Sequence, residues 1–165
     1  MQFIILFLWL SFSSIPTSLP TQIKPFPSID VKTVDGKTVN TKDYLQNDKI
    51  TIVSFWATWC TPCKRELDAI NEVYSDWVDN YNVQLLAITI DDARGLTRVP
   101  ALVSSKGWEF IVLADSKQEL MQTLNFQTIP QTFLLDQNGN IIYTHSGYNP
   151  GDEINLEEEI KKLRL

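Results

Sequence analysis

The chain has few of the residues on which several common chemistries depend. Its 165 residues include one histidine and only two cysteines. One histidine leaves little room for a histidine-based metal centre, and two cysteines cannot form a disulfide-rich scaffold. Positive charge is also scarce, because 14 Lys and Arg stand against 20 Asp and Glu, for a net charge of −6. We therefore expect no nucleic-acid partner, since phosphate binding needs a clustered positive field. The acidic charge favours a soluble monomer.

Charge is absent altogether from the first 23 residues. Within them, residues 3–10 form an unbroken apolar run, and a Ser-, Thr- and Pro-rich stretch follows at 11–21. The run is shorter than the ~20 residues that cross a bilayer and has the length of the hydrophobic part of a signal peptide. We predict that residues 1–23 are a signal peptide or N-terminal anchor and that residues 24–165 form one exported domain. A buried first strand or helix is the alternative.

Apolar strands alternate with helices along the rest of the chain. Hydrophobic residues make up 44% of the sequence, enough for one compact core at this length. The pattern at 29–40 predicts a β-hairpin with a type I′ turn at Asp35-Gly36. We expect buried strands at 50–56, 83–90 and 110–113, a second hairpin from 131–136 and 140–145, and helices at 62–79, 98–106, 117–124 and from 153 onward. This order predicts an α/β fold with a central mixed sheet, helices on both faces and an N-terminal hairpin extension.

The chemistry is expected at Cys60-Thr61-Pro62-Cys63, the C-x-x-C segment that contains both cysteines. It follows a buried strand and begins a helix, where unpaired backbone N–H groups and the helix dipole stabilise a thiolate. Cys60 should lie exposed at the cap, able to attack a disulfide in a partner, and Cys63 should resolve the mixed disulfide. Pro62 is tolerated in the first turn because its missing N–H would have no helical partner there.

Three other uses of the two cysteines remain open at this point. A purely structural disulfide would close so small a loop that it would stabilise the fold little. A zinc site needs four ligands, and Cys60, Cys63 and His145 supply at most three unless the chain dimerises around a shared metal. The thiols could also be two small buried hydrophobic side chains. At a strand-to-helix junction, however, the C-x-x-C spacing favours a redox pair.

Two separate segments resemble one protein family. The segment F-W-A-T-W-C-T-P-C-K-R-E at 55–66 resembles the active site of thioredoxin-fold thiol–disulfide oxidoreductases. Its W-C-x-P-C-K form followed by Glu is similar to the exported TlpA-like (ResA-type) branch. Further on, T-I-P-Q-T-F-L-L-D-Q-N-G-N-I at 128–141 resembles the second signature of the family, and G-Y-N-P-G-D-E at 147–153 its lead into the last helix. The resemblance covers about residues 26–163 and implies a thioredoxin-like fold.

The resemblance implies a role for each matching residue. Cys60 would be the nucleophile, Cys63 the resolving thiol, and Pro130 a cis proline that faces them and shapes the docking groove. The implied substrate-binding residues are Trp59, Pro62 and Ile129. The first would shield the cysteine pair, and the backbone of the last would bond an extended client segment in the manner of β-augmentation. No metal or other cofactor is implied beyond the redox-active disulfide between the two cysteines.

One departure from the family pattern affects proton transfer. Cytosolic thioredoxins carry a buried Asp at the position of Ser54, so the proton of Cys63 needs another acceptor here. In the exported branch a carboxylate near the end of the next strand often has this role, and Asp92, with Asp91 beside it, matches that position. Glu66, which matches the branch pattern, is the second proton-transfer candidate. Both could instead be ordinary residues, Asp92 as a strand-end cap and Glu66 as the partner of a surface base.

Two further positions are interpreted without a catalytic role. Asp68 replaces the proline that usually kinks the first helix in this family, so we expect a straighter helix. His145 lies on the last predicted strand and is interpreted as a plain exposed side chain.

Together these features predict an extracytoplasmic thiol–disulfide oxidoreductase that reduces disulfides in client proteins through a mixed disulfide at Cys60. Because an oxidising compartment cannot re-reduce the pair, a membrane-bound thiol–disulfide electron donor is an expected partner. One alternative is a thiol peroxidase on the same fold, since Thr58-Trp59-Cys60 fits the T-x-C form of a peroxidatic cysteine. Another is a non-catalytic binding module with vestigial cysteines, which the intact Cys60, Cys63 and Pro130 argue against.

Overall fold

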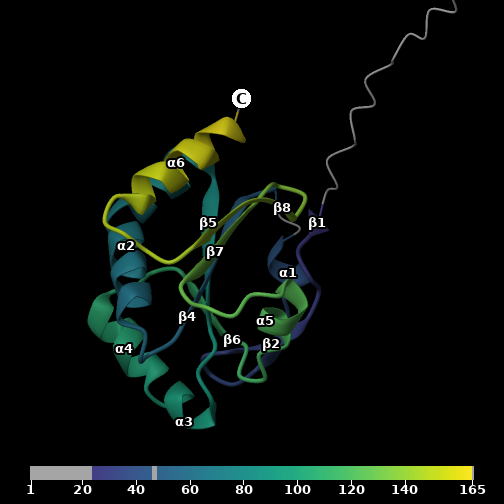
Figure 1. Cartoon of the computed structure of the whole chain (residues 1–165), viewed down its shortest axis with the longest axis vertical. Helices are drawn as coiled ribbons and strands as arrows, with labels where there is room; N and C mark the ends of the chain where they lie inside the picture. Colours follow the sequence, from purple (N-terminus) through teal and green to yellow (C-terminus); the bar gives the residue numbers. More distant parts are fainter. Residues whose placement is uncertain (1–23, 46–47, 165) are drawn as a thin grey trace, which may run out of the picture.

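A computed structural model describes residues 24–45 and 48–164 of the chain. Across this part of the chain, eight strands form one sheet in the order β1-β8-β7-β4-β5-β6-β2-β3 (Figure 1). The strands are β1 (Lys24–Pro25), β2 (Asp30–Thr33), β3 (Thr38–Asn40), β4 (Ile50–Trp56), β5 (Val83–Thr89), β6 (Ile111–Ala114), β7 (Gln131–Leu135) and β8 (Asn140–Ser146). The helices are α1 (Lys42–Leu45), α2 (Thr61–Tyr81), α3 (Ala93–Leu96), α4 (Val99–Lys106), α5 (Glu119–Leu124) and α6 (Asp152–Lys162). The predicted signal segment, residues 1–23, lies outside the described residues.

The centre of the sheet is formed by β4 and β5, which are parallel and buried along their whole length. Their β-branched and aromatic residues suit a strand that is covered on both faces. β6 continues the parallel part, whereas β7 pairs antiparallel with β4, and β8 antiparallel with β7. The sheet is therefore mixed, as the alternation of elements predicted.

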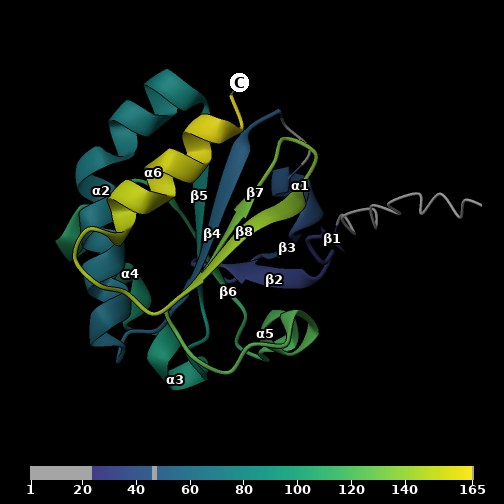
Figure 2. The same cartoon turned by 45° about the horizontal axis from the view of Figure 1, so that its top comes forward.

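Helices cover both faces of this sheet, which confirms the predicted layers. α2, α4 and α6 lie on one side, and α1 and α5 on the other (Figures 1 and 2). The helix α6 packs along α2 and buries Leu156 and Ile160. Among the described residues, no helix has the length and apolar character needed to cross a membrane.

The N-terminal hairpin joins the sheet at its edge, where β2 pairs antiparallel with both β3 and β6. The expected type I′ turn is wrong, because that turn needs a positive φ at both central residues. Asp35 does not have one, whereas Gly36 does, at +88°. The Gly36 N–H donates to the Thr33 carbonyl and the Thr33 N–H to the Lys37 carbonyl, both at 2.9 Å. These two bonds close a longer loop in which glycine takes the left-handed position.

The start of α5 is decided by a side chain rather than by the hydrophobic pattern. α5 begins at Glu119 and not at Lys117, because the Asp115 carboxylate accepts the N–H groups of Glu119 and Leu120, each at 2.9 Å. The sequence does not predict α1, α3 or β1. Four residues or fewer are too few to display a hydrophobic period.

An aromatic cluster supports the end of β4 that leads to the cysteines. Trp56 packs edge to face on Trp108, with ring centroids 5.2 Å apart. On the neighbouring residue, Phe55 contacts Phe126 and Phe133 with centroid distances of 4.7 and 6.0 Å. Phe55 and Trp56 are fully buried. Because core packing is dense, the start of the following loop is held in place from both faces of the sheet.

Candidate active site

The two cysteines lie where β4 passes into α2. Cys60 is the N-cap of α2, with extended backbone angles, and its sulfur lies 3.3 Å from the backbone N–H nitrogen of Cys63. Cys60 and Cys63 are joined by a disulfide with their Cα atoms 5.4 Å apart. The positive end of the α2 dipole and its unpaired N–H groups therefore point at the Cys60 sulfur, an arrangement that stabilises a thiolate after reduction.

The surface around the pair is formed by the residues on either side of Cys60. Trp59 is 68% exposed, and Thr61 and Pro62 are exposed as well. Cys60 retains 5% exposure, whereas Cys63 has none. Cys60 is thus less exposed than the sequence predicted, yet it is the sulfur that a partner can reach first. This order of access agrees with the nucleophile and resolving roles that the resemblance implies.

The loop before β7 faces the cysteines. The Ile129–Pro130 peptide bond is cis, as the resemblance implies. The Cys60 sulfur lies 3.9 Å from the Ile129 carbonyl oxygen. Pro130 is buried, and its carbonyl accepts the Gly147 N–H at 2.8 Å. Among the described residues, the Ile129 N–H has no hydrogen-bond partner, so this half-buried residue keeps a backbone donor for a docked chain.

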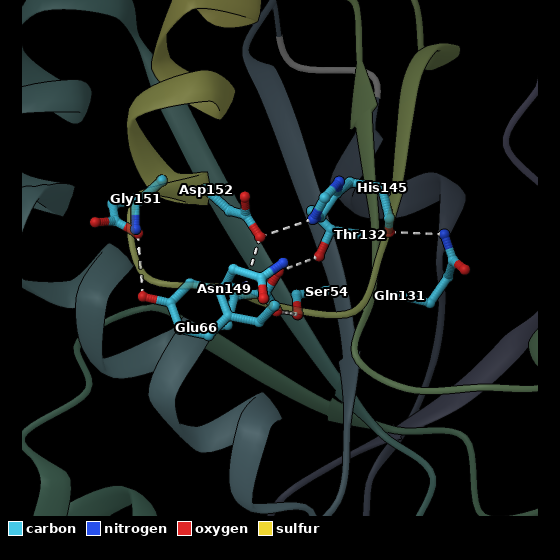
Figure 3. Close-up of polar contacts among 10 residues, drawn as sticks. Ser54, Glu66, Gln131, Thr132, His145, Asn149, Gly151 and Asp152 are labelled. Atoms are coloured by element: carbon cyan, nitrogen blue, oxygen red, sulfur yellow. Dashed lines mark hydrogen bonds and ion pairs between the residues drawn. The ribbon is translucent and has the colours of Figure 1, made fainter.

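Glu66 is buried behind the cysteines and not on the surface. Its side chain is 5% exposed and lies one turn beyond Cys63 on α2. The Ser54 hydroxyl donates to one carboxyl oxygen and the Thr132 hydroxyl to the other, both at 2.7 Å (Figure 3). Ser54 and Thr132 face each other across β4 and β7. The position that carries Asp in cytosolic thioredoxins therefore holds a hydroxyl that binds a carboxylate supplied by the helix.

The environment of Glu66 favours its protonated form. Burial raises the pKa of the Glu66 carboxyl above its ordinary value, and this effect exceeds the opposing effect of the two hydroxyl donors. Among the described residues, no Lys or Arg forms an ion pair with this carboxylate. A buried carboxyl without a cationic partner is a group that can take up and release a proton.

Asp92, the other proton-transfer candidate, has a different environment. It is exposed and is the N-cap of α3, where one carboxyl oxygen accepts the N–H groups of Arg94 and Gly95 at 3.0 and 2.8 Å. The Gly95 N–H, followed by the Arg94 N–H and the nearby Arg charges, lowers the pKa of Asp92. Glu66, and not Asp92, lies buried one turn from the resolving cysteine on α2.

The neighbouring Asp91 has a structural task that the sequence does not reveal. It is 2% exposed, and its carboxylate accepts the Thr58 N–H at 2.7 Å, the Thr58 hydroxyl at 2.8 Å and the Thr89 hydroxyl at 2.6 Å. The Lys64 ammonium donates to the Thr58 carbonyl at 3.0 Å. The loop that carries Trp59 and Cys60 is therefore fixed to the end of β5 through the N–H and hydroxyl of Thr58, and to α2 through its carbonyl.

An open groove of about 520 Å³ lies beside the cysteine pair. Thr58 and Trp59, which precede Cys60 in the chain, line it together with Arg94 and Arg98. Asp92 also lines this groove. A groove of this size next to an exposed tryptophan offers room for a segment of a client chain.

Asp68 connects two helices in place of the proline expected from the family. Its carboxylate accepts the Trp108 indole N–H at 3.0 Å and pairs with the Lys106 ammonium at 2.6 Å. α2 runs from Thr61 to Tyr81 without interruption, and the straighter course expected without the proline stays a prediction.

His145 is not the plain exposed side chain that the sequence suggests. Its ring Nε2 lies 3.0 Å from the Asp152 carboxylate, and the two side chains are 30% and 19% exposed (Figure 3). Both residues line a small pocket of about 10 Å³ together with Glu66. Strand alternation could place His145 on the inner face, but it could not reveal that the turn before α6 returns Asp152 to it. No group of three or more metal-ligating side chains occurs in the described part of the chain.

One family profile and several individual proteins are similar to this chain. The sequence profile described as the AhpC/TSA family matches residues 23–144. Sporulation thiol-disulfide oxidoreductase A of Bacillus subtilis is 31% identical over 118 residues, which cover 71% of this chain and 69% of that protein. Thiol-disulfide oxidoreductase ResA of Bacillus thuringiensis subsp. konkukian is 29% identical over 140 residues, covering 85% of this chain and 77% of that protein.

A solved structure is also similar to the fold of this chain. A thioredoxin-like protein from Porphyromonas gingivalis superposes with a TM-score of 0.75 at 41% identity, covering 84% of this chain and 90% of that one. This likeness confirms the thioredoxin-like fold that the two sequence signatures predicted.

Proposed function

Because the chain belongs to the AhpC/TSA family and is a thiol–disulfide oxidoreductase with a thioredoxin-like fold, we propose that it works outside the cytoplasm and reduces disulfides in client proteins. The observation that carries this proposal is the position of Cys60. Its sulfur lies at the start of α2, 3.9 Å from the Ile129 carbonyl oxygen, and the residue before it is the exposed Trp59. A helix N-terminus that stabilises a thiolate and a backbone segment suited to docking thus meet at one sulfur atom.

The reaction transfers two electrons from the protein to the client. The Cys60 thiolate attacks one sulfur of the client disulfide, and the other client sulfur leaves as a thiolate. The Cys63 thiol then loses its proton, and its thiolate attacks the Cys60 sulfur. This second attack releases the remaining client sulfur as a thiolate and forms the Cys60–Cys63 disulfide. The client thiolates take up protons from water, so the client is reduced and the protein is oxidised.

Glu66 is the proposed acceptor of the Cys63 proton. It lies one turn along the same helix, and both side chains are buried. Burial raises the pKa of Glu66 and so brings it closer to that of a thiol. A base whose pKa approaches that of its proton donor transfers protons more readily. Asp92 is less suited to this role because its carboxylate is exposed and already caps α3.

Docking of the client is proposed at Trp59, Pro62, Ile129 and Pro130. The free Ile129 N–H can bond to an extended client segment beside the cis proline, in the manner of an added strand. Trp59 and the adjacent groove can receive the residues that flank the client cysteine. This mode uses backbone contacts, which allow clients with different sequences.

The location and the electron donor are also part of the proposal. The uncharged residues 1–23, with their short apolar run, support export or anchoring at the membrane. In an oxidising compartment the disulfide needs a source of electrons, so a membrane-bound thiol–disulfide donor is the proposed partner. The redox-active pair is the only cofactor that the mechanism requires, and the proposed working form is a monomer.

Trapping of the mixed disulfide tests the proposed function. Cys63→Ser should retain the client on Cys60, because the second attack is lost, whereas Cys60→Ser should form no adduct. We would expose each reduced variant to disulfide-containing proteins and separate the products without reducing agent. The proposal predicts adducts with the first variant that disappear after treatment with dithiothreitol. Adducts of equal amount with Cys60→Ser would contradict it.

The thiol peroxidase alternative can be measured beside it. The Thr58 hydroxyl donates to Asp91 and not to Cys60, so this threonine does not support peroxide activation at the sulfur. We expect slow consumption of hydrogen peroxide and fast reduction of a peptide disulfide by the same reduced protein. The reverse order of rates would favour the peroxidase.

A further inference from the structure

We propose that His145 and Asp152 set the pH range in which Glu66 accepts the proton of Cys63, through the combined charge of the pair on a pocket that all three residues line. The pair would act on Glu66 and not on the sulfur atoms, so both are positioning residues. This inference rests on the proposed function, because it concerns the proton step of the same exchange reaction.

The geometry places the pair behind the carboxyl of Glu66. His145 on β8 is the cross-strand partner of Thr132 on β7. The Thr132 hydroxyl donates to the Glu66 carboxyl at 2.7 Å. Asp152 lies 3.0 Å from the His145 ring and also accepts the Asn149 N–H at 2.7 Å (Figure 3). The pocket between them and Glu66 measures only about 10 Å³, roughly the space of one water molecule. Little solvent therefore separates the charges, and screening is weak.

Other titratable groups also face the pocket, and each has its own partner or stays neutral. Tyr143, Tyr148 and Glu153 face it from β8, the following loop and α6. Burial raises the pKa of Tyr143, and burial with the Glu153 hydrogen bond raises that of Tyr148 to about 12, so both phenols stay neutral near neutral pH. Glu153 is held by the Tyr148 hydroxyl and the Gly151 N–H, each at 3.1 Å. Glu159 and Lys162 lie near Tyr143 and have opposite charges.

The sign of the coupling follows from the charges. The Asn149 N–H lowers the pKa of Asp152, so this carboxylate keeps its negative charge. A protonated His145 offsets that charge and favours the carboxylate form of Glu66. Without that positive charge the charge of Asp152 is not offset, and it raises the pKa of Glu66, which becomes a stronger base.

Two substitutions that remove charges of opposite sign test the proposal. His145→Gln removes the positive charge and should raise the pKa of Glu66, whereas Asp152→Asn removes the negative charge and should lower it. We expect shifts of about half a unit or more in each direction. The readout is the side-chain carboxyl carbon signal of Glu66 in a nuclear magnetic resonance titration of the oxidised protein. The signal is identified by its absence from Glu66→Gln.

A second readout connects the pair to the reaction. The rate at which the reduced protein is oxidised by oxidised glutathione, followed by tryptophan fluorescence, should have a pH profile that moves up for His145→Gln and down for Asp152→Asn. Glu158→Gln is the matched control, because Glu158 is an exposed carboxylate on the same helix and does not line the pocket. Glu158→Gln should change neither the pKa of Glu66 nor the pH profile of the oxidation rate.

The outcomes separate the inference from the function on which it rests. Shifts of the Glu66 pKa in the same direction in both variants, or no shift, would overturn the inference. A purely structural effect would not depend on the sign of the charge that is removed. A shifted pKa of Glu66 with an unmoved rate profile would overturn it as well. Failure of the wild type to exchange with any disulfide would instead count against the proposed function, and the titration of Glu66 would still be readable.

Discussion

At the scale of single residues, the carboxylate beside the resolving cysteine comes from a helix and is held by two strands. The hydroxyl groups of Ser54 and Thr132 each take one oxygen of Glu66. Hydroxyl groups can donate to a carboxylate and can also accept from a carboxylic acid. The site therefore satisfies Glu66 in both protonation states, which a lysine or arginine partner would not do. This adaptability suits a residue that gains and loses a proton in each cycle.

The raised pKa of Glu66 predicts how stability depends on pH. Burial raises this pKa above the ordinary glutamate value of 4.5. Between the two values the folded protein holds a proton that the unfolded chain has released, so the free energy of unfolding falls as pH rises through this window. Each unit of elevation corresponds to about 1.4 kcal/mol. Glu66→Gln has no such group, so its stability relative to wild type should increase from pH 4.5 upward.

Urea denaturation of the oxidised protein at several pH values measures this difference. Glu72→Gln serves as the control, because Glu72 is an exposed residue on the same helix. Its stability difference from wild type should stay nearly constant with pH. A constant difference for Glu66→Gln as well would mean that folding does not raise the pKa of Glu66.

At the scale of elements, the end of β5 holds the loop between β4 and α2. Asp91 supplies this connection through the N–H and hydroxyl of Thr58. Asp91→Ala would leave three donors without their acceptor in a buried place, at a cost of about 3 kcal/mol in the free energy of unfolding. A displaced Cys60 should also slow exchange with a small disulfide, by about tenfold or more. Urea denaturation and stopped-flow fluorescence measure the two effects.

Two neighbouring positions sharpen this test. Asp92→Ala removes an exposed cap of α3, so its effects should be much smaller than those of Asp91→Ala. Gly95→Ala should resemble the Asp91 variant, because the added Cβ would lie 2.8 Å from the Asp91 Cβ. Equal losses in the Asp91 and Asp92 variants would show that the buried hydrogen bonds do not position the cysteine loop.

The same elements explain what the sequence could and could not predict. The C-x-x-C pair, its helix and the buried strands were predictable, because each depends on neighbouring residues. The choice between Glu66 and Asp92 was not, because it depends on the cross-strand register that sets Ser54 opposite Thr132. Likewise, the role of Asp91 depends on contacts between residues 33 positions apart. The pairing of His145 with Asp152 depends on a turn whose path has no hydrophobic pattern.

At the scale of the whole molecule, strand direction brings the functional segments to one edge of the sheet. The parallel strands β4 and β5 both end there, so the loop that leads to Cys60 meets Asp91 through Thr58. β7 is antiparallel to β4 and begins at this edge, which places Pro130 opposite the cysteines. β8 reverses direction again, and its end brings His145 and the start of α6 to the same side. Nucleophile, docking loop and proton-handling residues thus meet although they are far apart in sequence.

The direction of electron flow is a property of this whole arrangement, and the reduction potential measures it. The C-x-x-C pair forms a disulfide in the folded protein. For the proposed reductase, the reduction potential of this disulfide must be lower than that of the client disulfides. We expect a two-electron midpoint potential of about −250 mV or lower. It is measured by equilibrating the protein with dithiol or glutathione buffers, trapping the free thiols and determining the mass of the product. A midpoint near about −120 mV would mark a protein that makes disulfides, and the direction proposed above would be reversed. The variant with both cysteines replaced by serine gives the background of the trapping reaction. If the wild type matched that background at every potential, no Cys60–Cys63 disulfide would form in solution, and exchange through this pair would be ruled out.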